Sequence, residues 1–453
     1  IASCLVGSEM CIRDRYVSRE YGSSATIQAT RVNIDTQGDG AVGALARVGG
    51  AAVTLEDVNI TTRGASAYGL FASGNGASLS ARNTVVNTSG ANASGLSMSN
   101  RAAVTLDNTR FTMQGAGANG IWSYLTGAGL SNSVVLRNGS QISTQDGVGL
   151  LASGGGHTFL VSDSNITTRT GGDIDSGVLL HSRSVTVTSG GVSTVIESEQ
   201  VNLEASNAVL TGDVLADSGT VDVSLKNGST LTGALVQRGP GRINSLTLDN
   251  ASAWTVRNDS SLGTLNNGGT VAFAAPAGGT GFKTLTVNNY IGGGTLALNT
   301  QLGDDASPTD KLVIDGGTTS GNTSLHVVNA GGNGGQTQYG IRVVETVNGG
   351  TTTADAFRLD SGSTGYRASA ATVSLNGYDY SLVRGGNGGV APDWYLTSDY
   401  TPPTAPPGPT DPTDPIDPGT PAPPIAPPDP VLPGNGYKNV SPESGAYAGN
   451  RLA

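Results

Sequence analysis

Charged and aromatic side chains are scarce in this sequence of 453 residues. Charged residues make up 13% of the chain and aromatic residues 5%, while glycine occupies 68 positions. The low charge argues against intrinsic disorder, because disordered chains usually combine many charges with few β-branched residues. The sequence is instead rich in Val, Thr, Ile and Leu. Together with the abundant glycine, this composition predicts short strands joined by many tight turns.

Long apolar runs and excess positive charge are also missing. No apolar run reaches the roughly 18 residues that a membrane-spanning helix needs. The formal net charge is -11, which argues against a nucleic-acid partner because phosphate contacts require a basic patch. We interpret the acidity as a property that keeps an exported protein soluble.

Cysteine occurs only at Cys4 and Cys11, within an opening segment whose composition differs from the rest. Residues 1–15 contain CLVGSEMCIRDR, which resembles a peptide translated from sequencing-adapter sequence, so we interpret them as non-native. The alternatives are a genuine upstream segment or a redox or metal-binding cysteine pair, which is a weak site without further ligands nearby. No signal peptide is visible, and we expect the true N-terminus to lie outside this sequence. The absence of later cysteines suits a chain that crosses membranes unfolded.

A unit repeats between residue 16 and about residue 189. Its marker is a glycine flanked by small and apolar residues, as in YGLFA, SGLSM and NGIWS, and the markers lie 26, 26, 25, 29 and 28 residues apart. Runs with period-2 alternation lie between the markers and predict strands with one apolar face. A repeat of this length indicates a solenoid. The marker glycines are Gly43, Gly69, Gly95, Gly120, Gly149 and Gly177.

From residue 190 to residue 253 the repeat shortens, and its segments align on Leu203, Leu225 and Leu248, 22 and 23 residues apart. Aligned leucines predict an internal apolar ladder, which favours a parallel β-helix. Antiparallel meanders that form a sandwich are the alternative. With strands stacked about 4.8 Å apart, roughly sixteen coils between residues 16 and 398 would form a rod on the order of 75 Å long.

Large aromatic residues gather in residues 254–400, whereas the repeats largely lack them. An open β-helix end exposes unpaired backbone groups, and aromatic residues bury the largest area per side chain. We therefore predict that this stretch caps the rod and is its most stable part. The aromatic residues are Trp254, Phe273, Phe282, Tyr290, Phe357, Tyr378, Tyr380, Trp394 and Tyr395.

An ordered series of motifs fills the same stretch. SSLGTLNNGGTVAF at residues 260–273 is followed by GFKTLTVNNYIGGGTLALNTQLGDDASPTDKLVIDG at 281–316, GNTSLHVVNAGGNG at 321–334, TQYGIRVVE at 337–345 and WYL at 394–396. The series resembles the pertactin-type C-terminal passenger region of type Va autotransporters. The resemblance implies an all-β, right-handed parallel β-helix of the pectate-lyase-like kind, with residues 16–253 as passenger repeats. It also implies that residues 254–400 form a β-rich cap and autochaperone, which folds first outside the outer membrane and templates the coils.

Proline concentrates at the C-terminal end, where residues 401–453 hold 16 of the 20 prolines. Because proline blocks strand ladders and helices, residues 401–435 predict an extended, disordered spacer. Residues 436–453 resemble the segment that opens the helix entering an autotransporter's translocator barrel. Glu443, Ala446 and Tyr447 fit that pattern, and Ser441 departs from its arginine. The resemblance implies that the partners are the protein's own translocator barrel, which we expect outside this sequence, and the outer membrane.

Acidic residues and histidines are the candidates for chemistry. Asp304, Asp305 and Asp310 form a candidate calcium site, but the glycine-rich nonapeptide of calcium-binding β-rolls is missing, so we favour turn chemistry. We interpret the remaining close acidic pairs as loops or solvated strand edges, and the three histidines are far apart in sequence. We therefore predict no catalytic, cofactor-binding or metal-binding residue. The pairs are Asp35 with Asp39, Glu56 with Asp57, and Asp173 with Asp175, and the histidines are His157, His181 and His326.

These patterns favour a surface-exposed passenger of a Gram-negative autotransporter, exported by type V secretion and active in adhesion or another virulence-type interaction. Its ligand would belong to the host, the extracellular matrix or a bacterial surface. The alternative is a carbohydrate-active β-helix enzyme, either a polysaccharide lyase or a hydrolase. The two hypotheses differ in whether a groove gathers two or more carboxylates with a base.

Overall fold

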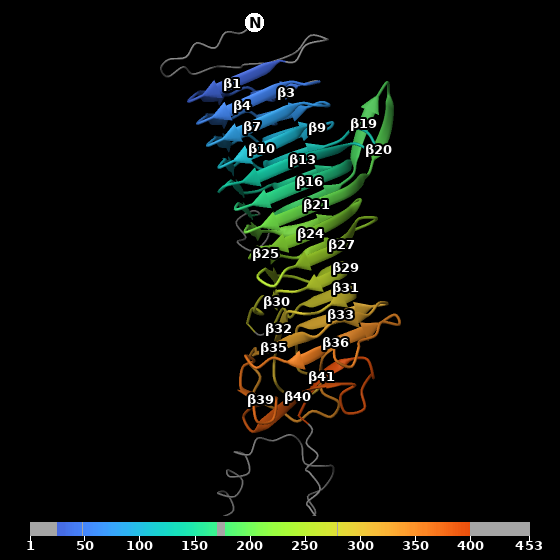
Figure 1. Cartoon of the computed structure of the whole chain (residues 1–453). Helices are drawn as coiled ribbons and strands as arrows, with labels where there is room; N and C mark the ends of the chain where they lie inside the picture. Colours follow the sequence, from blue (N-terminus) through green and yellow to red (C-terminus); the bar gives the residue numbers. More distant parts are fainter. Residues whose placement is uncertain (1–24, 48, 170–176, 279, 399–453) are drawn as a thin grey trace, which may run out of the picture.

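The computed structural model describes residues 25–47, 49–169, 177–278 and 280–398. These residues form an elongated rod of stacked strands that ends in a cap (Figure 1). Residues 1–15, 401–435 and 436–453, to which we assigned the opening segment, the spacer and the translocator helix, lie outside the described residues. None of the described residues is helical, so none of them builds a helix long and apolar enough to cross a membrane.

A coil of the rod contributes one strand to each of three sheets. β4 (Ala52–Glu56), β5 (Asn59–Thr62) and β6 (Tyr68–Ser73) form one such coil. Each of these strands pairs in parallel with the equivalent strand of the next coil. Parallel pairing of this kind confirms the predicted solenoid of the right-handed β-helix class and excludes antiparallel meanders for these coils.

Sheet 1 runs the length of the rod. Its strands are β1 (Thr26–Thr30), β4, β7 (Ser78–Arg82), β10 (Ala103–Asp107), β13 (Ser131–Arg137), β16 (Gly155–Ser162), β21 (Ser198–Ser206), β24 (Thr220–Lys226), β27 (Arg242–Leu248), β29 (Ser260–Asn267), β31 (Thr284–Ile291), β33 (Lys311–Asp315), β34 (Thr319–Ser320) and β36 (Ile341–Val347), joined by the cap strands.

Sheet 2 also runs the length of the rod, with one strand for each coil. Its strands are β2 (Asn33–Thr36), β5, β8 (Val85–Thr88), β11 (Arg110–Met113), β14 (Gln141–Thr144), β17 (Asn165–Thr168), β22 (Val209–Thr211), β25 (Thr230–Gly233), β28 (Ala253–Val256), β30 (Thr270–Phe273), β32 (Thr295–Thr300), β35 (Thr323–Asn329) and β37 (Phe357–Leu359).

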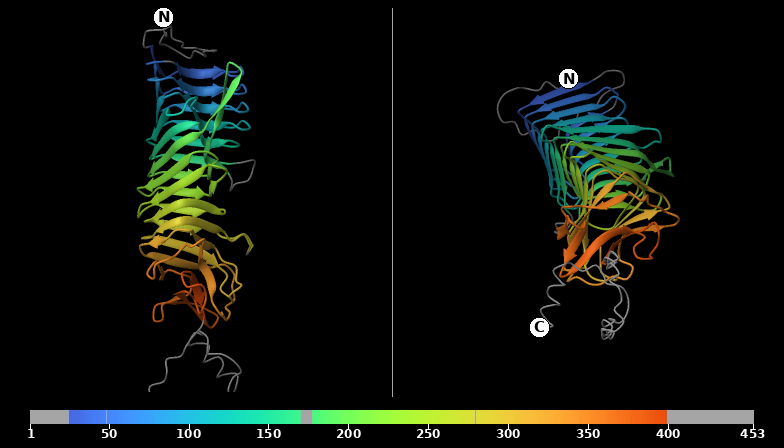
Figure 2. Two further views of the ribbon diagram at one scale, coloured as in Figure 1. Left: turned by 90° about the vertical axis from the view of Figure 1, so that its right-hand side faces the viewer. Right: turned by 60° about the horizontal axis from the view of Figure 1, so that its bottom comes forward.

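Sheet 3 is shorter and ends at residue 237. Its strands are β3 (Val42–Arg47), β6, β9 (Ser94–Ser99), β12 (Asn119–Tyr124), β15 (Val148–Ser153), β18 (Val178–Arg183), β23 (Asp213–Ala216) and β26 (Leu235–Gln237). After β18 the chain leaves the coil as an antiparallel hairpin of β19 (Val185–Ser189) and β20 (Val192–Ile196). Figure 2 shows this hairpin standing beside the coils.

The glycine markers all lie in or just before the strands of sheet 3, where a larger residue would clash with a neighbouring strand. A Cβ atom on Gly69 would lie 2.2 Å from Val86 Cγ1 and 2.8 Å from the carbonyl oxygen of Gly95. Only glycine lets neighbouring coils approach this closely. One marker is wrongly aligned, because Gly149 stacks under Leu179 and not under Gly177.

The internal apolar ladder exists, but one predicted alignment is wrong. Leu225 pairs with Leu248, as expected, whereas Leu203 pairs with Val223. The leucine-based alignment slipped by two residues. Because strand side chains alternate with period 2, such a slip keeps the same face inward and leaves the hydrophobic pattern unchanged. The pattern alone therefore could not reveal the error.

The rod is also shorter than predicted. Sheet 2 contains 13 strands in the described residues, against roughly sixteen predicted coils. The prediction assumed that every residue after residue 16 coils. The hairpin at residues 185–196 and the antiparallel cap at residues 366–397 instead leave the coil path.

The cap closes the C-terminal end of sheet 1. β41 (Trp394–Thr397) pairs antiparallel with both β36 and β40 (Tyr378–Arg384). β39 (Thr372–Leu375) and β38 (Tyr366–Arg367) continue the antiparallel pairing. This arrangement covers a strand edge that would otherwise template aggregation. Parallel pairing continues from β25 through β28 to β30, so the division at residues 253/254 coincides with no break in the stack and stays a prediction.

Candidate functional site

Aromatic rings fill the core at the C-terminal end of the rod. The ring centroids of Tyr290 and Phe357 lie 5.8 Å apart, and Phe357 meets Trp394 edge-on at 5.6 Å. All three side chains are buried. The Tyr290 hydroxyl accepts a hydrogen bond from Asn267 Nδ2 at 2.9 Å, so its polar end is satisfied inside the core. Stacked and edge-on rings stabilise a core beyond the area they bury.

Buried hydrogen bonds fasten the cap strand β41 to the last coils. Asp393, which is fully buried, accepts bonds from the Thr346 backbone N–H at 2.8 Å and hydroxyl at 2.7 Å. Arg342 Nη1 lies 3.4 Å from the same carboxylate. The Trp394 indole N–H donates to Thr352 Oγ1 at 3.0 Å. Because these partners are far apart in sequence, the bonds form only when the cap docks.

The three aspartates considered for calcium do not converge on one point. The Asp310 carboxylate accepts from the backbone amides of Lys283 at 2.7 Å and Asn299 at 2.9 Å. Asp305 accepts from three successive amides of residues 338–340, and Asp304 caps its own turn. Burial raises the pKa of Asp310 despite these bonds. Each carboxylate thus satisfies separate backbone donors, which is turn and loop chemistry.

His157 lies inside the solenoid and not on a surface. Its Nδ1 is 2.8 Å from the Ser123 hydroxyl, and its Nε2 is 2.7 Å from the carbonyl oxygen of Gly154. The geometry fits a neutral ring that donates from Nε2 and accepts at Nδ1. Burial lowers the pKa of His157 to about 4. The side chain is 1% exposed, so this serine–histidine pair is a structural network without access to substrate.

The other two histidines form separate pairs with aspartate. His181 Nε2 lies 2.8 Å from Asp217, and His326 Nδ1 lies 3.0 Å from Asp360. The hydrogen bond from His326 lowers the pKa of Asp360. No serine or cysteine contacts either ring in the hydrogen bonds of the described residues. The two pairs therefore do not reproduce a nucleophile–base–acid arrangement.

The acidic pairs identified in the sequence separate in the same way. Asp35 bonds Arg63 of the next coil at 3.1 Å, and Glu56 lies 3.8 Å from Arg82. Asp39 caps a backbone amide and Asp57 accepts from an asparagine of the next coil. Asp173 and Asp175 lie outside the described residues. Among the residues with described positions, no three His, Cys, Asp or Glu side chains gather as a metal site.

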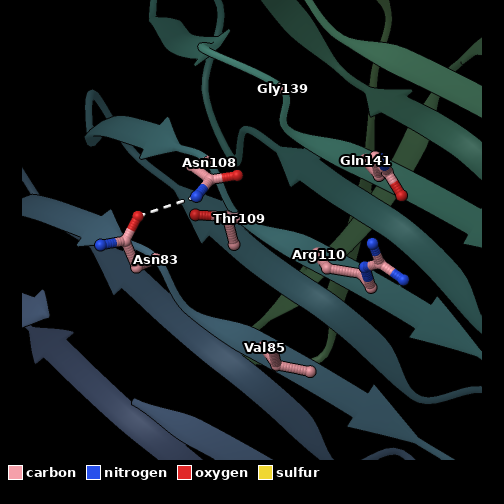
Figure 3. A pocket seen from close by; sticks show the side chains of 7 residues that line it. All are labelled: Asn83, Val85, Asn108, Thr109, Arg110, Gly139 and Gln141. Atoms are coloured by element: carbon pink, nitrogen blue, oxygen red, sulfur yellow. Dashed lines mark hydrogen bonds between the residues drawn. The ribbon is translucent and has the colours of Figure 1, made fainter. Parts of the chain in front are cut away.

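A shallow polar groove of about 500 Å³ lies along the turns between sheets 1 and 2 (Figure 3). Asn83 and Asn108 form its edge, both with left-handed backbone (φ 48°). Asn108 Nδ2 donates to Asn83 Oδ1 at 2.8 Å, so the turns of successive coils are linked by an asparagine ladder. Asparagine tolerates this conformation better than most residues. The groove is lined by amides, one valine and Arg110, which gives it no catalytic pair.

Sheet 3 carries a row of aromatic rings on its outer face. Tyr68 lies 5.6 Å from Phe71 and 6.4 Å from Trp122, and Trp122 lies 4.8 Å from Tyr124 (centroid distances). All four side chains are half-buried. Burial and the neighbouring Tyr124 raise the pKa of Tyr68. The sequence prediction missed this row, although the signal was present in the marker segments YGLFA and NGIWS.

Comparisons with known proteins identify relatives of this architecture. Residues 260–368 match the family model of the autochaperone domain type 1. A probable autotransporter of Escherichia coli K12, YfaL, is 34% identical over 200 residues, 44% of this chain and 14% of the relative. The adhesin BmaC autotransporter of Brucella suis is 29% identical over 360 residues, 66% of this chain and 10% of the relative. The autotransporter adhesin AIDA-I of Escherichia coli is 39% identical over 120 residues, 26% and 8% respectively.

These relatives are much longer than the regions that match. The alignments span between 8% and 14% of the three proteins. The matched family model coincides with the last coils of the rod and the beginning of the cap, where the buried aromatic rings gather.

Proposed function

We propose that this chain, which is an autotransporter passenger region, forms a surface-exposed rod that acts in adhesion and folds from its C-terminal end. Two of the relatives are named adhesins. The observation that carries the proposal is the position of the autochaperone match, residues 260–368, over the coils whose core includes Phe273, Tyr290 and Phe357.

A rod of this kind suits display at a cell surface. Each added coil lengthens the molecule by about 4.8 Å while burying its apolar face against its neighbour. The cognate partner that the family implies is a translocator barrel in the Gram-negative outer membrane. The passenger would be anchored there, with the rod extending outward to contact host, matrix or bacterial surfaces.

The C-terminal end is suited to act as a folding seed. Solenoids nucleate where local stability is highest and then propagate through neighbour contacts. The buried, mutually packed rings of Tyr290, Phe357 and Trp394 contribute to that stability, and β36 offers sheet 1 an edge on which preceding coils can pair. The enzyme alternative gains no support, because the three histidines and those acidic residues singled out in the sequence that the structure describes make separate structural contacts.

Display on cells tests the adhesion role. The full passenger, joined to a translocator barrel, should be expressed in a non-adherent strain and compared with a strain that displays the barrel alone. We expect adherence to host cells, matrix proteins or neighbouring bacteria only when the rod is displayed. Equal adherence of the two strains, at equal surface levels of barrel, would contradict the proposal.

A further inference from the structure

The aromatic row spans three successive coils of sheet 3, with rings on β6 and β12 and serines on β9 between them. Phe71 in β6, Ser97 in β9 and Trp122 in β12 are register partners across the sheet. In β9 the flanking residues Leu96 and Met98 belong to the inner core and are fully buried. Because strand side chains alternate, Ser97 points to the outer face, together with its partners Phe71 and Trp122.

Two hydroxyl groups beneath this row have no partner. Ser97 and Ser94 are both 0% exposed, and neither Oγ atom makes a hydrogen bond in the described structure. Ser94 is the register partner of Tyr68. Buried polar atoms are normally satisfied, so an unsatisfied pair at one place requires an explanation. Here the two hydroxyls lie under a face that also presents the polar ends of tyrosine and tryptophan side chains.

We propose that this aromatic face, formed by Tyr68, Phe71, Trp122 and Tyr124 over Ser94 and Ser97, binds a neutral glycan chain extended along the rod axis. The proposal rests on the adhesion function and names the chemical class of its ligand. A pyranose ring has an apolar face of C–H groups, which packs on an aromatic ring, and an equatorial edge of hydroxyls. Tyr68 and Tyr124 carry an O–H group for that edge, whereas the Trp122 indole N–H already donates to Ser153 Oγ at 3.4 Å.

The backbone positions of the aromatic residues favour an extended chain over a single sugar. Phe71 and Trp122 occupy the same register position two coils apart, which is about 10 Å along the axis. This distance is comparable to the repeat of a disaccharide in an extended β-linked polysaccharide. A neutral chain is favoured because the net charge of -11 would repel an acidic glycan.

Intrinsic fluorescence offers a direct test on the full chain. The sequence has three tryptophans, and Trp254 and Trp394 are 0% and 5% exposed. A ligand on the aromatic face should therefore change the emission of Trp122 alone. The probes are hexasaccharides of β1,4-linked glucose, β1,4-linked N-acetylglucosamine and β1,4-linked mannose. We expect saturable binding of at least one, with a dissociation constant below about 1 mM.

Variants then locate the binding site. Trp122→Ala should weaken binding, measured by calorimetry, about tenfold or more, and Trp122→Phe should retain most of it because a ring remains. Tyr339→Ala is the matched control, since Tyr339 is an exposed aromatic residue (47%) outside the row. Circular dichroism and thermal unfolding would show whether each variant folds. If Trp122→Ala misfolds, glycan binding is compared between Trp122→Phe and Tyr124→Ala instead.

Several results would contradict glycan binding at the aromatic face. The proposal is overturned if none of the three hexasaccharides binds, or if folded Trp122→Ala or Tyr124→Ala binds as well as the parent chain. It is also overturned if the substitutions only abolish self-association, measured by analytical ultracentrifugation, because the row would then be an interface between copies. Cells that display the rod and adhere without glycan binding would contradict this inference and leave the adhesion role standing. Glycan binding without adherence would contradict the adhesion role instead.

Discussion

The N-terminal coils and the C-terminal end of the rod differ in where most of their large aromatic side chains lie. Trp254, Tyr290 and Phe357 point into the core and are buried, whereas Phe71 and Trp122 lie half-buried on the outer face of sheet 3. The N-terminal core is filled mainly by Ala, Val, Leu and Ile. In the N-terminal coils Phe111 and Phe159 also lie in the core, but most of the large aromatic side chains there lie on the outer face of sheet 3.

The difference follows from the number of strands in a coil. The first coils have three strands, with glycines that bring neighbouring coils close together. After β26 sheet 3 ends and the remaining coils have strands in sheets 1 and 2 only. Larger side chains such as Trp254 and Tyr290 then fill the space between two sheets. In the proposals above, the C-terminal end would seed folding and the outer face of the N-terminal coils would bind a ligand.

Removing the aromatic end should have the largest effect. If residues 254–398 are deleted, we expect the upstream coils to lose their protease resistance, because they lose the seed on which they pair. Limited proteolysis, followed by mass spectrometry, measures this. A matched deletion of the first coils, residues 25–73, should leave the remaining rod resistant. Unchanged resistance after the C-terminal deletion would contradict the seed role.

A single substitution sharpens the comparison. Trp254→Ala should lower the free energy of unfolding by about 3–5 kcal/mol, because it removes a buried ring and leaves a cavity. It also removes the indole bond to the carbonyl oxygen of Gly233, which is 3.0 Å long. Trp122→Ala should lower the free energy of unfolding much less, since that ring is half-buried. Urea denaturation of both variants provides the measurement, and equal losses would remove the proposed difference between the two ends.

Lowering the pH should reduce the free energy of unfolding because of His157. The unfolded pKa is about 6.5, and burial lowers the folded pKa to about 4, so the unfolded chain binds more protons between these values. The contribution is fully present above pH 6.5 and is lost as the pH falls toward 4. The contribution of His157 to the free energy of unfolding is about 3 kcal/mol.

The pH dependence of denaturation tests this prediction. His157→Gln should flatten the stability profile between pH 4 and pH 6.5, at some cost in stability at neutral pH. His181→Gln is the matched control, because His181 is partly exposed and bonds Asp217 on the outside of the rod. An unchanged profile in the His157 variant would show that another group causes the acid sensitivity.

Breaking the asparagine ladder at Asn108 should have the smallest effect on stability. Asn108→Ala removes the bond to Asn83 and places a less tolerant residue at φ 48°, so we expect a loss of about 1 kcal/mol. Asn108→Gly should cost less, since glycine accepts the left-handed conformation. Thermal unfolding of the two variants distinguishes these contributions. Equal losses for the two variants would show that the side-chain bond matters more than the backbone conformation.

Several features of the fold were predictable because they repeat. The marker glycines predicted coils of 25 to 29 residues, and the period-2 runs predicted which side chains are buried. A repeat in the sequence does not reveal where the coil path is interrupted. Neither the hairpin of β19 and β20 nor the shift from Gly177 to Leu179 was predicted, because each interrupts the repeat locally.

The candidate sites were less predictable. The Asp304, Asp305 and Asp310 group looked compact in sequence, yet its carboxylates cap amides from separate segments. The aromatic row on sheet 3 went unrecognised for the opposite reason. Its residues come from different coils, and outward rings cannot be distinguished from inward ones until the register is known.

The sequence by itself determined that this chain coils, which residues face the core of most coils, and that its C-terminal third resembles an autochaperone. These properties depend on local periodicity and on motifs read in order. Only the tertiary structure decided the strand register, the antiparallel closure by β41 and the outer position of Trp122. The physical reason is that each of these depends on pairing between residues tens of positions apart, whose partners a slip of two residues would exchange without changing the hydrophobic pattern.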